Sequence, residues 1–219
     1  MLISERALDF IRDGDVVGLG TGRAAFSFIR ALGERVRAGL QIQGVPTSCA
    51  STELAEQLGI PLTTLDEVEA LDICVDGADE VDPRLNLIKG YGGALLREKI
   101  VATAAKRLVI LVGTEKLVAR LGARGILPVE VVPFALGFCR RQIAALGCRP
   151  EPRQAGDQLY VTDNGNHILD CKIAPLPDAA AFERALRSIP GVVGTGLFLG
   201  MAHEVLVQDG DEVVVKQRS

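Results

Sequence analysis

The first half of the chain alternates short apolar runs with segments whose apolar residues recur at helical spacing. Four apolar runs predict strands, at residues 15–19, 40–45, 71–75 and 108–112. Three intervening segments predict helices, at residues 24–36, 48–58 and 94–105. Ser48 or Ser51 is the expected N-cap of the second helix. Strands that alternate with helices form right-handed crossovers, so this half predicts a mostly parallel sheet.

The pattern changes after Pro128. Further strands are predicted near residues 129–132, 148–153, 158–162, 167–173 and 192–198. Two helices are predicted among them, at residues 134–146 and 178–188. The order β-α-β-β-α-β, with a turn at 162–166, is typical of a ferredoxin-like unit. Apolar runs at 204–207 and 212–216, around Asp209-Gly210, predict a closing hairpin that returns to the first sheet.

Together these patterns predict an α/β protein, with a mostly parallel Rossmann-like sheet covered by helices on both faces and a smaller ferredoxin-like α+β domain. Because the closing hairpin rejoins the first sheet, the smaller domain is expected to be an insertion. We therefore expect a Rossmann-like catalytic domain at residues 1–127 and 199–219, and a ferredoxin-like domain at residues 128–198.

Composition narrows the classes of partner. Hydrophobic residues make up 48% of the chain and charged residues 24%, as in an ordinary globular protein. The net charge of −4, with no run of Lys or Arg, argues against nucleic acid as a partner. The longest apolar runs, such as 108–112, are too short to span a membrane. The N-terminal segment lacks the apolar core of a signal peptide, so we expect a cytoplasmic protein.

The five cysteines predict neither a metal site nor a disulfide framework. Their number is odd, none forms a C-x-x-C pair, and no histidine stands at ligand spacing from them. Cys74 lies within an apolar run and is expected to be a small buried hydrophobe. Neither His167 nor His203 has sequence support as the partner of a catalytic thiol, so both are interpreted as structural or surface residues.

A glycine-rich turn, GLGTGR at 18–23, follows the first predicted strand. The dinucleotide fingerprint needs glycine at its sixth position, where this chain has Arg23, and an acid at the end of the second strand, which is missing near Val45. A strand–glycine–helix turn still presents backbone N–H groups to an isolated phosphate, and Arg23 adds a bidentate grip. The alternative is a tight turn that needs glycine for backbone reasons alone. We prefer the phosphate interpretation.

A second cluster, DGADEVDPRLNLIKGYGGALLRE at 76–98, combines carboxylates, a lysine and a glycine turn. Asp76 and Asp79 are expected to emerge at the carboxyl end of a strand, where open α/β sheets bind ligands. Carboxylates held close together raise the pKa of one of them, which suits proton transfer near neutral pH. Lys89, beside the glycine turn, can stabilise an oxyanion. Glu98 is expected in the first turn of a helix, where the dipole lowers the pKa of a carboxyl and burial raises it.

Each of these groups also has a plainer interpretation. The aspartates can form a solvated acidic loop, Lys89 can be a surface lysine, and Glu98 can merely suit a helix N-terminus. Acid, base and cation beside a flexible backbone nevertheless favour proton transfer on a small polar substrate.

Eight blocks of sequence occur in a fixed order along the chain. They are GLGTG at 18–22, TS-x-x-S at 47–51, DGADE at 76–80, IKG at 88–90, LLREKIVA at 95–102, LPVEVVPFA at 127–135, TDNGN at 162–166 and PGVVGTGLF at 190–198. In these blocks the chain resembles the ribose-5-phosphate isomerases of type A over essentially its whole length. So many ordered blocks are far more specific than a lone glycine loop.

The resemblance implies the interconversion of D-ribose 5-phosphate and D-ribulose 5-phosphate, an aldose–ketose isomerisation of the pentose phosphate pathway, without metal or cofactor. It implies that Glu98 is the general base, which moves a proton between C2 and C1 through a cis-enediolate. Asp76 and Asp79 would handle hydroxyl protons and assist ring opening. Lys89 would stabilise the enediolate oxygen.

The expected substrate-binding residues surround the two glycine turns and include a later lysine. They are Thr21, Gly22, Arg23, Ala24, Gly77, Ala78, Gly90, Tyr91, Gly92 and Lys116. The resemblance also implies a homodimer or homotetramer and a small sugar phosphate as substrate, while the net charge and the short apolar runs argue against a nucleic-acid or membrane partner. The apolar stretch 192–201 either joins a subunit contact or packs internally.

Three features depart from the family pattern. Arg23 and Ala24 stand where the family usually has serine and threonine, no lysine precedes Lys89, and Tyr91 stands where glycine is common. We hypothesise that Arg23 replaces the family's early lysine, exchanging a point charge for a planar fork. Tyr91 either narrows the sugar pocket or faces away from it.

Other functions stay open from the sequence alone. A sugar-phosphate sensor can share this fold, but it would need a DNA-binding segment, which we do not find in the sequence. A dehydrogenase is disfavoured by Arg23 and by the missing acid near Val45. An isomerase of a different aldose phosphate is the remaining alternative.

Overall fold

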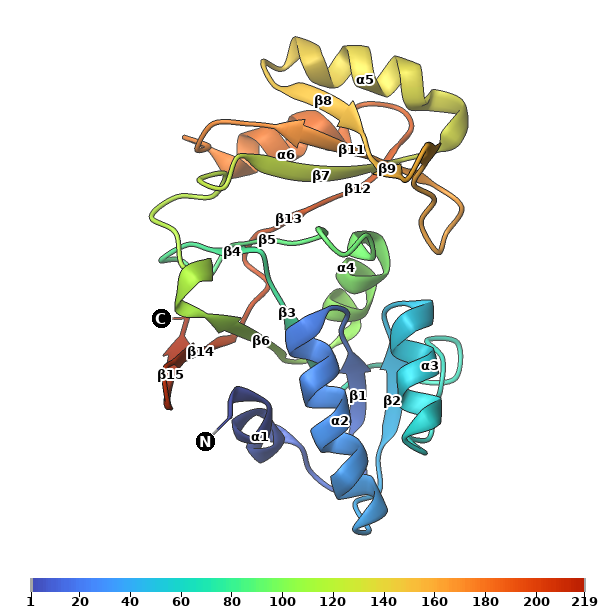
Figure 1. Ribbon diagram of the computed structural model, residues 1–219, viewed down its shortest axis with the longest axis vertical. Coiled ribbons are helices and arrows are strands. Elements are labelled where there is room, and N and C mark those ends of the chain that lie inside the picture. The colour runs from blue at the N-terminus through green and yellow to red at the C-terminus, as the bar shows by residue number, and fades with distance from the viewer. Residues whose placement is uncertain (1, 219) are drawn as a thin grey trace. The chain divides into compact units, whose positions relative to one another are not determined.

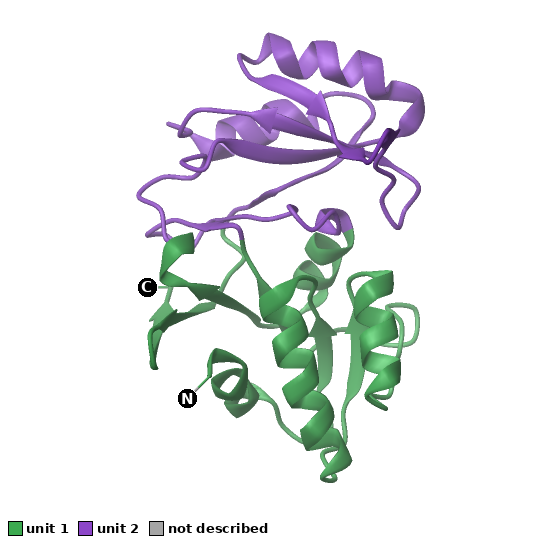
Figure 2. Cartoon of the chain, viewed as in Figure 1, with its two compact units in different colours: residues 1–78, 97–116, 200–219 green, residues 79–96, 117–199 purple. Residues whose placement is uncertain are grey.

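The computed structural model describes residues 2–218, which form two compact units (Figure 2). Unit 1 comprises residues 1–78, 97–116 and 200–219, and unit 2 comprises residues 79–96 and 117–199. The domain boundaries expected from the sequence place residues 79–96 and 117–127 with the Rossmann-like part instead. Compact units and domains are different divisions of a chain, so those domain boundaries stay a prediction.

Unit 1 is built on a six-stranded sheet in the order β15-β14-β6-β3-β1-β2 (Figure 1). The strands are β1 (Val16–Leu19), β2 (Gln43–Pro46), β3 (Ile73–Gly77), β6 (Leu108–Gly113), β14 (Glu204–Asp209) and β15 (Glu212–Gln217). All neighbouring pairs are parallel except β14 with β15. The mostly parallel sheet and the closing hairpin that rejoins it are therefore confirmed.

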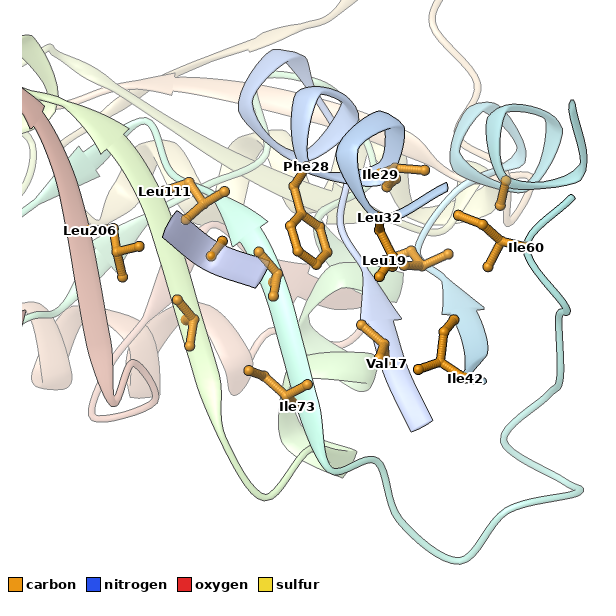
Figure 3. Close-up of a cluster of buried hydrophobic side chains, with 14 residues drawn as sticks. Val17, Leu19, Phe28, Ile29, Leu32, Ile42, Ile60, Ile73, Leu111 and Leu206 are labelled. Carbon is orange, nitrogen blue, oxygen red and sulfur yellow. The ribbon is translucent and has the colours of Figure 1, made fainter. Parts of the chain in front are cut away.

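Helices cover both faces of this sheet. They are α1 (Ile3–Ala7), α2 (Arg23–Arg37), α3 (Cys49–Gln57) and α4 (Leu95–Ala104), with short 3₁₀ turns η1 (Leu8–Phe10) and η2 (Thr114–Lys116). Successive residues of a strand point to opposite faces. Val17 and Leu19 of β1 belong to the core that includes α2 (Figure 3), whereas a side chain at Gly18 would meet Val101 of α4 at 2.7 Å. The predicted helices on both faces are thus confirmed.

The core between α2 and the sheet follows from the helical spacing of its apolar residues. Phe28, Ile29 and Leu32 are fully buried against β1, β3 and β6 (Figure 3). Complete burial of such side chains contributes about 1.5–3 kcal/mol each. The predicted cap of α3 is also confirmed, since the Ser48 hydroxyl accepts a hydrogen bond from the Ser51 backbone N–H at 3.1 Å.

Unit 2 contains a four-stranded antiparallel sheet in the order β12-β7-β11-β8. Its strands are β7 (Ile126–Val131), β8 (Arg149–Pro152), β11 (His167–Lys172) and β12 (Val192–Thr195), and its helices are α5 (Leu136–Ala145) and α6 (Ala179–Arg187), with the 3₁₀ turn η3 (Pro133–Ala135) before α5. This is the β-α-β-β-α-β order predicted for a ferredoxin-like unit.

The turn predicted at 162–166 is fixed by a buried carboxylate. Glu130 of β7 is fully buried, and its Oε1 accepts hydrogen bonds from Thr162 at 3.0 Å, Asn164 at 3.3 Å and Asn166 at 2.9 Å. These bonds explain why the turn is rich in short polar side chains, since each supplies a donor to the same oxygen.

Two predicted strands of this unit are wrong in extent. The run at 158–162 gives only β10 (Gln158–Leu159), which pairs with β9 (Gln154–Ala155) in a separate ribbon, because Thr162 turns towards Glu130. The run at 192–198 splits into β12 and β13 (Leu197–Phe198). The split falls at Gly196, where a side chain would lie 2.3 Å from the Lys89 carbonyl oxygen.

The strand β13 belongs to a third small sheet. It pairs with β5 (Leu87–Ile88), which pairs in turn with β4 (Glu80–Val81). Leu197 and Phe198 are buried in unit 2, so this part of the apolar stretch 192–201 packs internally. Through this sheet, the hairpin of β4 and β5 is joined to β13, which directly follows the ferredoxin-like strands.

The predictions for Cys74 and for the two histidines agree with the structure. Cys74 is fully buried in β3, as expected of a small buried hydrophobe. His203 accepts a hydrogen bond from the Leu108 backbone N–H at 3.0 Å, and the His167 ring is 2.9 Å from the Tyr160 carbonyl oxygen. Across residues 2–218, every helix is too short or too polar to cross a lipid bilayer.

The cap of α6 gives a direct test of this local structure. The Asp178 carboxylate accepts a hydrogen bond from the Ala181 N–H at 2.9 Å. We predict that Asp178→Ala lowers the free energy of unfolding by about 1 kcal/mol, because the N-terminal donors of α6 lose their acceptor. Urea denaturation followed by circular dichroism measures this. Asp178→Asn keeps an acceptor and should lose much less. Equal losses in the two variants would contradict the capping role.

Candidate functional site

The glycine loop of unit 1 joins β1 to α2 and lies against β3. Gly20 has no room for a side chain, because a Cβ there would lie 2.2 Å from Asp76 Oδ1. Gly22 is the N-cap of α2 and has φ of 101°, in the region that favours glycine. Arg23 is the first residue of α2 and is exposed to solvent. The loop therefore offers a helix N-terminus with a cationic side chain beside it, as a phosphate site needs.

Four hydroxyl groups hold this loop in place. Thr21 Oγ1 lies 2.7 Å from Thr47 Oγ1, 2.8 Å from Ser48 Oγ and 3.1 Å from Ser51 Oγ. Ser51 also donates to the Gly20 carbonyl oxygen at 2.7 Å. The Thr21 side chain thus ties the loop to the start of α3. Sequence reasoning did not assign Thr47, Ser48 and Ser51 to the site, although the TS-x-x-S block was visible.

Asp76 is fixed by the same loop. Its Oδ1 accepts hydrogen bonds from the Thr21 backbone N–H at 3.1 Å and from the Gly77 N–H at 2.7 Å. Asp76 was expected just after the strand, but it is the penultimate residue of β3, because pairing with β6 continues to Gly77. Its exposed fraction is 1%, so the solvated acidic loop considered above is excluded for this residue.

Glu98 lies in the first turn of α4 and has an exposed fraction of 3%. Helices that connect parallel strands run antiparallel to them, so the first turn of α4 lies at the carboxyl edge of the sheet. Val101, one turn later on the buried face, lies against Gly18 of β1. Glu98 is therefore level with the loop that follows β1. Half-buried Lys116 ends the turn η2 directly after β6, at the same edge.

The remaining substrate-loop positions of unit 1 flank Asp76. A side chain at Gly77 would lie 3.7 Å from the Ala24 Cβ, so Ala24 faces the end of β3. Gly77 and Ala78 are half-buried. Unit 1 thus gathers Thr21, Gly22, Arg23, Ala24, Asp76, Gly77, Ala78, Glu98 and Lys116 at the carboxyl edge of one sheet.

Unit 2 holds the other predicted residues, around the turn after β5. Lys89 has an exposed fraction of 3%, and its Nζ lies 5.6 Å from the centre of the Phe198 ring. It is therefore a buried lysine and not a surface one. Asp79 donates its backbone N–H to the Ile88 carbonyl at 2.8 Å, and its Oδ2 accepts from the Tyr91 N–H at 3.0 Å. Asp79 is thereby held beside the turn of Gly90, Tyr91 and Gly92.

The backbone and the side chain of Tyr91 have different partners. The hydroxyl donates to the Ile126 carbonyl oxygen at 3.3 Å, and the ring packs on the hydrophobic core of unit 2. Burial, reinforced by the charges of Asp79 and Glu80, raises the pKa of Tyr91 to about 12. The half-buried ring therefore packs against the core of unit 2, while the backbone N–H donates to Asp79.

Chemically, these groups can move protons and hold an anion. Buried carboxylates at fixed positions suit general acid–base catalysis, and a buried lysine suits the stabilisation of a developing negative charge. A helix N-terminus with Arg23 suits a phosphate. Within residues 2–218, no group of three or more His, Cys, Asp or Glu side chains is arranged to hold a metal ion.

Fold and site together define an α/β protein with buried carboxylates, and a glycine-rich loop before a helix N-terminus, at the carboxyl edge of a parallel sheet. Comparison with known proteins agrees with this class. The model of the family "Ribose 5-phosphate isomerase A (phosphoriboisomerase A)" matches residues 43–212. The chain belongs to this family.

Individual relatives match nearly the whole chain. The ribose-5-phosphate isomerase A of Roseiflexus castenholzii is 50% identical over 96% of this chain and 92% of its own length. The solved ribose 5-phosphate isomerase A of Methanocaldococcus jannaschii has a TM-score of 0.93 and 41% identity, covering 98% of this chain and 96% of that one. A D-ribose-5-phosphate isomerase in complex with phospho-erythronic acid has a TM-score of 0.94, 41% identity and the same coverage.

The contact between Gly20 and Asp76 can be tested directly. We predict that Gly20→Ala lowers kcat for the family's reaction by about 10²-fold, because the new methyl group displaces the Asp76 carboxylate. It should also cost about 1–3 kcal/mol of stability through overpacking. Kinetics and thermal denaturation measure both. The control is Gly137→Ala in α5, where the added Cβ lies 3.7 Å from the nearest side-chain atom, and it should leave kcat unchanged.

Proposed function

We propose that this protein is an aldose–ketose isomerase that interconverts D-ribose 5-phosphate and D-ribulose 5-phosphate. The observation that carries the proposal is the buried Glu98 at the carboxyl edge of the sheet, level with a phosphate-type loop, in a chain of this family. The relative solved with phospho-erythronic acid, a phosphorylated sugar acid, supports a sugar phosphate as the ligand class.

Glu98 is the general base in this proposal. With the sugar in its open form, its carboxylate removes the proton from C2, and the electron pair moves to make the C1 oxygen an enediolate oxygen. Return of the proton to C1 and transfer of the O2 proton to O1 complete the ketose. A positioned base of this kind typically contributes about 10²–10⁴-fold to the rate.

Asp76, Asp79 and Lys89 complete the proposed chemistry. Asp76 and Asp79 carry the hydroxyl protons during ring opening and between O2 and O1. Lys89 stabilises the enediolate oxygen, since its ammonium is largely withdrawn from water and its charge is weakly screened. Asp76 and Asp79 are three residues apart along the chain, which limits the separation of their Cα atoms to about 11 Å.

The phosphate end of the substrate is assigned to the loop before α2. The N–H groups of the first turn, including those of Arg23 and Ala24, are without helical acceptors and favour an anion. Arg23 and Lys116 supply the positive charge. Thr21 acts mainly through its backbone and through the hydroxyl cluster that fixes the loop.

The wider setting is part of the same proposal. The protein acts in the cytoplasm, without a cofactor, as a homodimer or homotetramer. Sedimentation analysis of the purified protein distinguishes these assemblies from a monomer. A panel of aldose phosphates, assayed with EDTA and without nucleotide, separates this isomerase from one that acts on another sugar and from a sensor that only binds.

The role of Glu98 gives the central prediction. Glu98→Gln keeps the size of the side chain and removes its basicity, so kcat should fall at least about 10²–10⁴-fold while thermal stability stays near that of the parent. Coupled kinetics, and the uptake of solvent deuterium into the product, measure the loss. Glu56→Gln, on the exposed face of α3, is the control and should be fully active. Substantial turnover by Glu98→Gln would refute the assignment.

The role of Arg23 gives a separate prediction. Arg23→Ala removes a charge-assisted contact worth about 1.5–3 kcal/mol, so KM for ribose 5-phosphate should rise about 10–100-fold with little change in kcat. Steady-state kinetics against phosphate-bearing sugars measure it. Arg30→Ala removes an equally exposed arginine two turns later on α2 and serves as the control. An unchanged KM in Arg23→Ala would contradict the hypothesis that Arg23 replaces the family's early lysine.

A further inference from the structure

The turn that follows Lys89 is hydrogen-bonded by Arg153, an arginine of unit 2 that is distant in sequence. Arg153 follows β8 directly, and the exposed fraction of its side chain is 14%. Its Nε and Nη2 donate to the two carboxylate oxygens of Asp170, in β11, at 2.9 and 2.6 Å. This bidentate pair fixes the plane of the guanidinium group.

The third nitrogen of the guanidinium group reaches the turn itself. Arg153 Nη1 donates to the Gly90 carbonyl oxygen at 3.0 Å and to the Tyr91 carbonyl oxygen at 3.1 Å. The Gly90 carbonyl also accepts the Gly93 N–H at 3.0 Å, which closes the turn. Two successive carbonyls therefore point at a single cation.

The orientation of these carbonyls fixes what the other side of the turn presents. In a trans peptide the C=O and the following N–H point in opposite directions. Arg153, by holding the carbonyls of Gly90 and Tyr91, turns the N–H groups of Tyr91 and Gly92 to the opposite side. The first of these donates to Asp79 Oδ2 at 3.0 Å. The orientation of the Asp79 carboxylate thus depends on a bond made by Arg153.

The flanks of the turn leave it little other freedom. The Lys89 backbone N–H donates to the Gly196 carbonyl oxygen at 2.9 Å, which fixes the lysine where it enters the turn. At the other end, a side chain at Gly93 would lie 2.2 Å from the Tyr160 hydroxyl, and the Tyr160 ring lies 5.7 Å from the guanidinium carbon of Arg153. Between these two anchors, Arg153 holds the turn through its hydrogen bonds to two carbonyls.

We infer that Arg153, aimed by Asp170, is a positioning residue for the isomerisation: it orients the peptides after Lys89 so that Asp79 and Lys89 keep their working geometry. The inference rests on the proposed function of Asp79 and Lys89. Arg153 touches no reacting atom. It acts through the turn, and the small displacement that follows its loss is costly, because a shift of about 1 Å in a catalytic group can lower a rate about 10²-fold.

The test compares Arg153→Lys with a matched pair in unit 1. Lysine keeps the charge beside Asp170 but lacks the planar fork, so it cannot bind the carboxylate and both carbonyls together. We expect kcat for ribose 5-phosphate to fall about 10–100-fold and KM to change less than about threefold. Arg107→Lys breaks a similar bidentate pair, in which Arg107 Nε and Nη2 lie 2.8 and 2.6 Å from the Glu204 oxygens, and should leave kcat unchanged.

A second variant separates positioning from folding. Arg153→Ala leaves a cavity of guanidinium shape, so added guanidinium at low millimolar concentration should restore part of kcat, whereas ethylammonium should not. Thermal denaturation reports the folded fraction of each variant. The inference is overturned if Arg153→Lys retains full kcat. It is also overturned if each variant loses activity only in proportion to its unfolded fraction and guanidinium does not rescue Arg153→Ala. An inactive parent protein would instead refute the proposed function, and with it the reaction that Arg153 serves.

Discussion

The close approach of Gly20 to Asp76 is the constraint on which the rest of unit 1's site depends. Only a residue without a side chain lets the loop after β1 come so near that the Thr21 backbone N–H reaches the Asp76 carboxylate. The same approach brings the loop to Ser51, whose hydroxyl binds the Gly20 carbonyl. The absence of one methyl group at Gly20 therefore holds a carboxylate, the glycine loop and the start of α3 together.

The main constraint in unit 2 is the burial of Lys89. An ammonium withdrawn from water is costly unless its surroundings compensate the charge. The face of the Phe198 ring, 5.6 Å from Lys89 Nζ, gives Lys89 part of such compensation. Natural proteins accept such local costs where function needs a fixed, weakly screened charge. Arg153 and Asp170 contribute to the local structure around Lys89, because they hold the turn that follows it.

Much of the fold could be predicted from periodicity alone, and the failures have a common cause. The parallel sheet, the helices on both of its faces and the β-α-β-β-α-β order follow from local patterns of apolar residues. The strands at 158–162 and 192–198 were wrong in extent because distant groups, Glu130 and the Lys89 carbonyl, redirect the chain there. The strand before Asp76 was predicted to end at residue 75, two residues too early, because pairing with β6 continues to Gly77.

The candidate site shows the same division. Asp76, Asp79, Lys89 and Glu98 could be proposed as site residues because they stand close together in sequence beside glycines. The partners that fix them could not, since Thr21 meets Ser48 across 27 positions and Arg153 meets Gly90 across 63. The spacing of neighbouring residues in the sequence cannot predict such contacts, because they form only when the sheets have formed.

The partial burial of the Tyr91 ring against the core of unit 2 has a consequence for the behaviour of the protein in alkali. Of the two tyrosines in the chain, Tyr91 has its pKa raised to about 12, and burial also raises that of Tyr160. An unfolded chain releases its phenolic protons near pH 10, so from about pH 10 to 12 it binds fewer protons than the folded one. Stability is complete below that window and declines through it. With no tryptophan in the chain, the absorbance of phenolate becomes a clean optical signal for the loosening of unit 2.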